Sequence, residues 1–257
     1  MQILVIGDII GKPGRQAIAK LLPGLRRENE IDLVIANAEN SAGGFGLTSD
    51  IVHELLDTGV SIFTSGNHIW AQKEIIPWLD SDLPVLRPLN YPPGVPGRGY
   101  LIRNNVMVVN IMGRTFMNSN LDCPFRAMDT LLAEINPRPP VIIVDFHAEA
   151  TSEKVAMGRY LDGKVSAVLG THTHIGTIDT RILPKGTAYV TDIGMTGPLD
   201  SVIGDNVESV IQRFLTGIPN RLFVGKGTSI LNSVRVTVDE TTGKALSIER
   251  IDRDTED

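Results

Sequence analysis

Residues 1–8 read MQILVIGD, a short apolar run that ends in a glycine and an aspartate. A continuous apolar run of this length is typical of a strand that is covered on both faces. The same pattern returns at residues 33–40, LVIANAEN, and at residues 60–68, VSIFTSGNH. Apolar residues at helical spacing separate these runs, at residues 18–25 and 48–57. This alternation of strand and helix predicts an α/β fold with a largely parallel sheet.

Later parts of the chain predict further strands. Apolar runs at residues 106–112, 141–144 and 165–169 are expected to be buried strands. Valines alternate with polar side chains at residues 234–238, which is typical of a strand with one exposed face. The last third of the chain is therefore expected to form a second sheet with more antiparallel pairing. We find neither an internal repeat nor a long linker, so residues 1–257 are predicted to form one domain.

The composition excludes several classes of protein. Apolar and aromatic residues make up 42% of the chain and charged residues 21%, which excludes wholesale disorder. The net charge of −6 does not suit a general nucleic-acid-binding protein, which needs a basic surface. The single cysteine, Cys123, excludes an internal disulfide and fits a reducing compartment. No run approaches the ~18 apolar residues of a membrane span, and the first run lacks a basic leader, so a cytoplasmic location is predicted.

Polar side chains that can bind a metal follow five of the six predicted buried strands. They are Asp8, Glu39, Asn40, Asn67, His68, His147, His172 and His174. Because ligands of open α/β sheets bind at the carboxyl ends of the strands, these side chains are expected to lie close together. A single residue of this kind is more often a cap or a hydrogen-bonding group, but its recurrence at five strand ends favours a metal site. The fifth histidine, His53, lies on the predicted helix at 48–57 and is expected to be structural.

The residue types indicate which ions and which chemistry to expect. Imidazole and carboxylate together suit Mn, Fe, Zn or Co, whereas Mg and Ca prefer oxygen alone. A carboxylate such as Glu39 can bridge two ions, and two ions ~3.5–4 Å apart can hold a phosphate and activate water. Side chains alternate along an extended segment, so His172 and His174 are expected to point to the same side. The pattern therefore predicts a two-metal centre suited to phosphate chemistry.

The order of these residues resembles the calcineurin-like metallophosphoesterase superfamily. The corresponding blocks are Asp8, Glu39-Asn40, Gly66-Asn67-His68, His147 and Gly170-Thr171-His172-Thr173-His174. The chain departs from the superfamily where Ile10 replaces a histidine, where Glu39-Asn40 replaces Gly-Asp, and where Ile69 replaces an acid. These departures, and residues 7–11, 37–40 and 191–198, resemble one bacterial branch, the YmdB-like family. Members of that family hydrolyse 2′,3′-cyclic nucleotides and other phosphodiesters.

The resemblance implies two packed mixed β-sheets flanked by helices, with two metal ions at the strand ends. One ion would be held by Asp8, Glu39, Asn40 and His174. The other would be held by Glu39, Asn67, His147 and His172, with Glu39 bridging the two. Iron and manganese are the expected metals, with zinc also compatible. A hydroxide on the metals would attack a small phosphodiester such as a 2′,3′-cyclic nucleotide, while His68 stays off the metals and protonates the leaving oxygen.

Other interpretations stay open on the sequence. The same centre would serve a phosphomonoesterase or a phosphoprotein phosphatase, and a regulatory protein could bind a nucleotide there without turnover. RNA ends are alternative substrates, and a homo-oligomer is neither indicated nor excluded. Residues 43–46, GGFG, are either a turn or a backbone cradle for phosphate, and Arg114 is a hypothetical contact to the nucleotide. The spacing of Gly7, Gly11 and Lys12 does not match a P-loop.

Overall fold

The computed structural model describes residues 1–118 and 120–256. The strands are β1 (Gln2–Ile6), β2 (Asp8–Ile9), β3 (Leu33–Asn37), β4 (Ile62–Thr64), β5 (Tyr100–Arg103), β6 (Val106–Met112), β7 (Val141–His147), β8 (Ala167–Thr171), β9 (Arg181–Ile182), β10 (Ala188–Val190), β11 (Met195–Pro198), β12 (Ser229–Leu231), β13 (Ser233–Val238), β14 (Ala245–Arg250) and β15 (Arg253–Asp254). The helices are α1 (Gly11–Glu28), α2 (Ser49–Asp57), α3 (Pro124–Glu134), α4 (Thr151–Leu161) and α5 (Val207–Thr216), with a 3₁₀ helix η1 (Lys73–Trp78).

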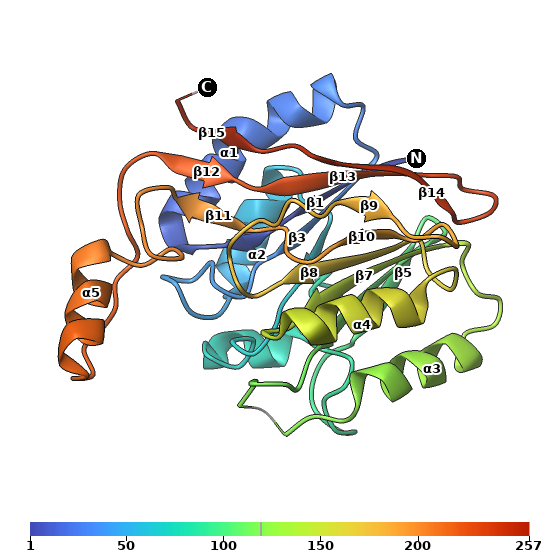
Figure 1. Ribbon diagram of the computed structural model, residues 1–257, viewed down its shortest axis with the longest axis horizontal. Helices are drawn as coiled ribbons and strands as arrows, with labels where there is room; N and C mark the ends of the chain where they lie inside the picture. Colours follow the sequence, from blue (N-terminus) through green and yellow to red (C-terminus); the bar gives the residue numbers. More distant parts are fainter. Residues whose placement is uncertain (119, 257) are drawn as a thin grey trace.

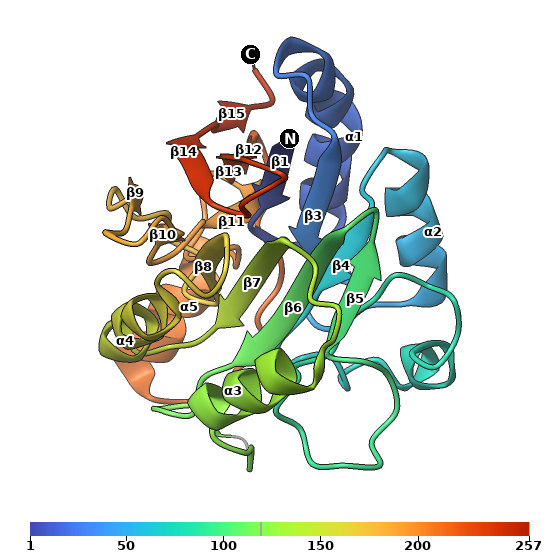
Figure 2. The same ribbon diagram turned by 90° about the vertical axis from the view of Figure 1, so that its right-hand side faces the viewer.

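Two mixed sheets form the centre of the molecule. The first has the strand order β14-β13-β1-β3-β4 and the second β5-β6-β7-β8-β10-β9. Strands β1, β3 and β4 are parallel to one another, as are β6, β7, β8 and β10. A smaller sheet, β15-β12-β11-β2, lies beside them. The α1 and α2 helices cover the first sheet and α3 and α4 cover the second, so the predicted fold of two packed mixed sheets flanked by helices is confirmed (Figures 1 and 2).

The apolar runs are continuous because each sheet has a core on both faces. Along β1, Ile3 and Val5 enter the core between the two sheets, where residues such as Val108 of β6 meet them. Leu4 and Ile6 point the other way, into the core beneath α1 and α2. Each fully buried aliphatic side chain of this kind contributes about 1.5–3 kcal/mol. A strand inside such a four-layer arrangement has no polar face, which is why the sequence shows no alternation there.

The C-terminal strands differ from the expectation. Their antiparallel pairing is confirmed, but β13 pairs with β1, with Ile3 opposite Val236, and β14 pairs with β13. These strands therefore extend the first sheet, and the second large sheet is built from residues 100–190. Alternating valines indicate how a strand pairs and which face it buries, but they do not identify the partner strand.

Helices α4 and α5 were not predicted from the sequence. The buried face of α4 consists of Lys154, Met157, Gly158 and Leu161, so a lysine and a glycine occupy half of its core positions. Its apolar periodicity is correspondingly weak. The α5 helix packs only Val210 into the body, and it projects from the molecule in Figure 1. None of the helices in the described ranges is both long and apolar enough to cross a membrane.

Candidate metal centre

The carboxyl ends of the parallel strands bring all eight predicted side chains into one connected cluster. Asp8 begins β2, just after β1, and Glu39 and Asn40 follow β3. Asn67 and His68 follow β4, His147 ends β7, and His172 and His174 follow β8. The two sheets thus each supply one side of the cluster, because their parallel strands end at a common edge. His147 is the last residue of its strand, which runs three residues beyond the predicted end at Val144.

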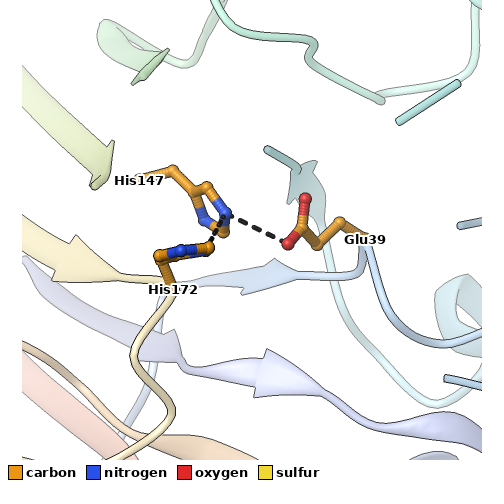
Figure 3. A group of neighbouring side chains, drawn as sticks. All are labelled: Glu39, His147 and His172. Carbon is orange, nitrogen blue, oxygen red and sulfur yellow. Dashed lines mark hydrogen bonds and ion pairs between the residues drawn. The ribbon is translucent and has the colours of Figure 1, made fainter. Parts of the chain in front are cut away.

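One half of the cluster converges on a single ring nitrogen. His147 Nε2 lies 3.0 Å from Glu39 Oε1, 3.0 Å from Asn67 Oδ1 and 3.0 Å from His172 Nδ1. Figure 3 shows Glu39, His147 and His172 pointing toward one another. A single N–H cannot serve three acceptors, whereas a cation placed among these atoms would contact all of them. Glu39, His147 and His172 each offer a ligand atom, and these atoms lie within 4.8 Å of one another.

The other half of the cluster contains a buried carboxylate oxygen without a donor. Asp8 is 0% exposed, and its Oδ1 accepts no hydrogen bond from any residue that the structure describes. This atom lies 3.8 Å from His174 Nε2 and 3.9 Å from His147 Nδ1. A buried carboxylate oxygen that accepts no hydrogen bond is costly, so it indicates a position that a further cation would complete. The donor set of carboxylate, imidazole and amide groups fits transition-metal ions.

Backbone amides fix the orientation of both carboxylates, each by donating to one of the two oxygens. The N–H of His172 donates to Asp8 Oδ2 at 3.1 Å, and the N–H of His68 donates to Glu39 Oε2 at 3.0 Å. The second oxygen of each carboxylate is thereby directed into the cluster. Gly66 has to be a glycine, because a Cβ there would lie 2.1 Å from the ring of His147.

Each of the three ligand-type imidazoles has one nitrogen held from outside the cluster. Nδ1 of His147 faces the Thr171 hydroxyl at 3.0 Å, and Thr171 in turn donates to Asp145 at 2.6 Å. Nδ1 of His174 donates to the carbonyl of Ile203 at 2.7 Å. Nε2 of His172 lies 3.0 Å from a carboxylate oxygen of Glu149. The remaining nitrogen of each ring is left free to act as a ligand, which is how metal-binding histidines are usually oriented.

Charge and burial compete throughout the cluster. Burial raises the pKa of Asp8 to about 6, which His174 and His147 offset only in part. Burial also disfavours the charge of Glu39, but His147 and His68 outweigh it and lower the pKa of Glu39 to about 2. Burial would lower the pKa of His147, yet Glu39 and Asp8 raise it to about 9. Without a metal, His147 therefore holds a proton where a cation would otherwise bind.

The His-x-His segment is not extended, contrary to the expectation. Strand β8 ends at Thr171, and both His172 and His174 have left-handed backbone, with φ of 96° and 66°. Residues other than glycine pay for this conformation, and such strain is found mainly at functional sites. The two rings therefore reach different partners: His172 lies against His147, and His174 faces Asp8 and Asn40.

The side chains of His68 and Asn40 lie within hydrogen-bond distance of each other. The Nδ1 of His68 lies 2.7 Å from Asn40 Oδ1, while the amide nitrogen of Asn40 faces Glu39 at 3.4 Å and His174 at 3.3 Å. In this arrangement Asn40 orients His68, and turning the amide over would bring its oxygen toward the acidic cluster. Burial lowers the pKa of His68, and Glu39 opposes only part of that shift.

A pocket of about 290 Å³ opens beside the cluster. Its lining includes Glu39, Asn40, His68, His172 and His174, together with Phe45, Glu149, Ile203 and Asp205, which the sequence reasoning did not assign to the site. Glu149 stands two residues after His147, and that proximity is the only signal that could have indicated it. The other three lie on loops whose positions depend on the folded chain.

Two acidic residues outside the cluster act on its histidines. Asp145 orients His147 through Thr171, whereas Asp192 accepts from the N–H and hydroxyl of Thr173 and so fixes the backbone between His172 and His174. Arg114 lines a separate pocket against α3 that shares no described residue with the pocket at the cluster. The hypothesis that Arg114 contacts the ligand therefore finds no support.

Comparisons with known proteins agree with the geometry of the cluster. Residues 4–251 match the sequence model of the YmdB-like proteins. The chain belongs to the YmdB-like family. The 2′,3′-cyclic-nucleotide 2′-phosphodiesterase of Bacillus subtilis (strain 168) is 48% identical to this YmdB-like chain over an alignment of 255 residues that covers 98% of this chain and 96% of that protein. A putative phosphatase/phosphodiesterase of Mycoplasma pneumoniae is 37% identical over 264 residues, covering 98% and 92%.

Solved structures of similar proteins share the whole fold of this YmdB-like chain. A hypothetical protein from Thermus thermophilus superposes with a TM-score of 0.93 and 44% identity, covering 99% of both chains. A novel phosphatase of Mycoplasma pneumoniae has a TM-score of 0.93 and 36% identity, covering 99% of this chain and 93% of the other. The similarity therefore extends well beyond the residues of the cluster.

Proposed function

We propose that this chain is a metal-dependent phosphodiesterase that hydrolyses 2′,3′-cyclic nucleotides. The observation that carries the proposal is the convergence of buried carboxylates and oriented imidazoles at one edge of two sheets, with Asp8 Oδ1 left without a donor among the described residues. The activity of the Bacillus subtilis relative supports the choice of substrate. The match over residues 4–251 supports a single metallophosphoesterase domain over residues 1–257.

The cluster supplies ligands for two ions. We assign Asp8, Glu39, Asn40 and His174 to one ion and Glu39, Asn67, His147 and His172 to the other, with Glu39 bridging. Asn40 can bind the first ion once its side-chain amide rotates by a half turn, so that its oxygen in place of its nitrogen faces the cluster. Iron or manganese, or alternatively zinc, would supply Lewis-acid stabilisation of the phosphate and a nucleophile active near neutral pH.

The side chains of the pocket perform the remaining tasks. His68 lines the pocket and is oriented by Asn40 at 2.7 Å, while its Nδ1 lies 3.6 Å from Glu39 Oε1. We assign to His68 the role of donating a proton to the leaving ribose oxygen. The pocket volume of about 290 Å³ lies just below the ~300–1,000 Å³ that is usual for small-molecule sites, so the pocket suits a small ligand such as a mononucleotide.

A hydrolysis panel with the metal-reconstituted protein tests the function. The substrates are 2′,3′-cyclic AMP, 3′,5′-cyclic AMP and AMP, with products identified by chromatography. We expect preferential opening of the 2′,3′ ring, abolished by a chelator, with 3′-AMP as product if the bond named for the Bacillus subtilis relative is the one broken. Phosphate released from AMP alone would instead indicate a phosphomonoesterase. Stoichiometric metal and nucleotide binding without turnover would indicate a regulatory binder.

The role of His68 is tested separately. His68→Ala should lower kcat by about 10²–10⁴-fold, the usual contribution of a general acid, while the metal content stays that of the parent chain. A variant that loses metal together with activity would make His68 a ligand instead. RNA ends as substrates and a cytoplasmic location stay predictions, and the oligomeric state stays open. A 2′,3′-cyclic-phosphate-terminated oligonucleotide added to the panel would test the first of these.

A further inference from the structure

The pocket at the cluster has an apolar side that phosphate chemistry does not require. Phe45 and Ile203 both line it, and each is 47% exposed. Ile10, which occupies the position of a histidine in related blocks, is the third apolar lining residue. Large apolar side chains beside converging polar groups are typical of pockets that bind a ligand with an apolar part. An inorganic phosphate would leave this side of the pocket uncovered.

The turn that carries Phe45 is closed by its own hydrogen bonds. Ala42 N–H donates to the carbonyl of Gly46 at 2.9 Å, and the N–H of Gly44 donates to the carbonyl of Asn40 at 3.1 Å. The side chain of Gln72 donates to the carbonyl of Phe45 at 2.9 Å. The N–H of Phe45 also donates, to the carbonyl of Ala42 at 3.4 Å, so the amides of Gly44 and Phe45 are engaged within the loop and the GGFG segment forms a turn. These bonds also hold the Phe45 ring at the pocket instead of letting it fold into a core.

The ring of Phe45 lies next to the proposed proton donor. Its centroid is 4.8 Å from that of His68, with the two planes at 69°, an edge-on contact. In a cyclic nucleotide the leaving oxygen and the base are carried by the same ribose, so a base has to lie near the residue that protonates that oxygen. Every nucleobase has a flat π face that stacks on an aromatic ring, and this stacking tolerates any base.

We propose that Phe45 is the platform on which the nucleobase of the substrate stacks, with Ile203 as an apolar flank of the same subsite. This inference rests on the proposed function and adds the part of the ligand that the metal centre does not recognise. Phe45 is then a specificity-determining residue that favours nucleotides over phosphodiesters without a base. It selects for the presence of an aromatic base and not for one base over another.

The test compares a nucleotide with a cyclic phosphodiester that has no base. The metal-loaded chain and its Phe45→Ala variant are assayed with 2′,3′-cyclic AMP and with glycerol 1,2-cyclic phosphate. We expect Phe45→Ala to lower the ratio of the two kcat/KM values about tenfold, mainly by raising KM for the nucleotide, since stacking acts alike on ground and transition states. Phe45→Trp should keep the parent ratio. Phe116→Ala, which removes an 84% exposed phenylalanine that does not line this pocket, is the matched control.

A binding measurement separates this inference from the proposed function. In calorimetry with AMP and with inorganic phosphate, Phe45→Ala should weaken the binding of AMP about tenfold more than the binding of phosphate. Calorimetry needs no turnover, so it tests the stacking platform even if neither cyclic substrate is hydrolysed. Failure to hydrolyse either substrate would overturn the proposed phosphodiesterase activity and leave the stacking platform standing. Equal losses of kcat on both substrates, with no selective loss of AMP affinity, would make Phe45 a residue that positions His68 and would overturn the stacking platform.

Discussion

Two sets of buried charged side chains lie close together in this molecule and differ in how completely they are paired. Lys154 and Asp192 are 1% and 0% exposed, and their charged atoms lie 2.6 Å apart. Asp192 also accepts from the N–H groups of Thr173 and Gly194. In the metal centre, by contrast, Asp8 is buried with an oxygen that has no donor among the described residues.

The difference distinguishes a supporting structure from a ligand site. A buried charge that is matched within the chain stabilises one backbone arrangement, here the segment that carries His172 and His174. A buried charge that the chain leaves unmatched persists only if something outside the chain completes it. We therefore expect the two sets to respond differently to substitution, the first in stability and the second in metal content and activity.

The largest effect is expected from Glu39→Gln. Glutamine keeps the shape of the side chain but removes the charge that we propose bridges two ions, so metal binding and turnover should both be abolished. Metal content by mass spectrometry and the rise of Tm on metal addition measure the loss. Glu28→Gln, on an exposed residue of α1, is the control and should behave as the parent. Undiminished metal in Glu39→Gln would refute the assignment.

The next effect should appear in the paired set. Lys154→Met leaves the Asp192 charge buried without its partner and should lower the free energy of unfolding by about 3–5 kcal/mol. Urea unfolding of the metal-free protein measures this, because the metal contribution is then removed. Adding Asp192→Asn should recover part of the loss, since it removes the stranded charge. If the single and the double variant are equally unstable, the ion pair is not the source of the stability.

A smaller effect is expected from Asp145→Asn. Asp145 accepts from the Thr64 hydroxyl and holds Thr171, which orients His147, so the amide should weaken metal affinity or activity about 10–100-fold. The exposed Asp129→Asn is the control. Metal affinity is read from competition with a chelator, and circular dichroism confirms folding. An Asp145→Asn variant with parental metal affinity and activity would show that Thr171 alone fixes the ring of His147.

Much of the fold and of the site could be predicted because both follow local rules. Runs such as residues 3–6 and 141–144 are apolar throughout because each strand is covered on both faces, and that pattern can be read directly from the sequence. The polar residues that follow strands of the same sheet had to meet, because parallel strands of one sheet end at one edge, and the packing of the two sheets then joins both groups. The eight predicted side chains accordingly form one connected cluster, whatever role each one plays.

What could not be predicted depends on contacts between distant segments. The pairing of β13 with β1 joins residues more than 200 positions apart, and alternation alone names no partner. The backbone of His172 and His174 is left-handed where Asp8 of β2 and Asp192 of the loop between β10 and β11 accept from the N–H groups of His172 and Thr173. The GGFG segment marks a turn at Phe45 but does not show where the ring points, Ile203 has no distinguishing local pattern, and only the folded chain brings both to one pocket.

The chain thus encodes its strands, its helices and the chemistry at the strand ends in short stretches, because burial on both faces and the need for metal-binding atoms act residue by residue. The register between distant strands, the tautomers that Thr171 and Ile203 impose, and the apolar side of the pocket arise only when the sheets pack. These features depend on distances between groups that the sequence places far apart, and folding alone brings those groups together.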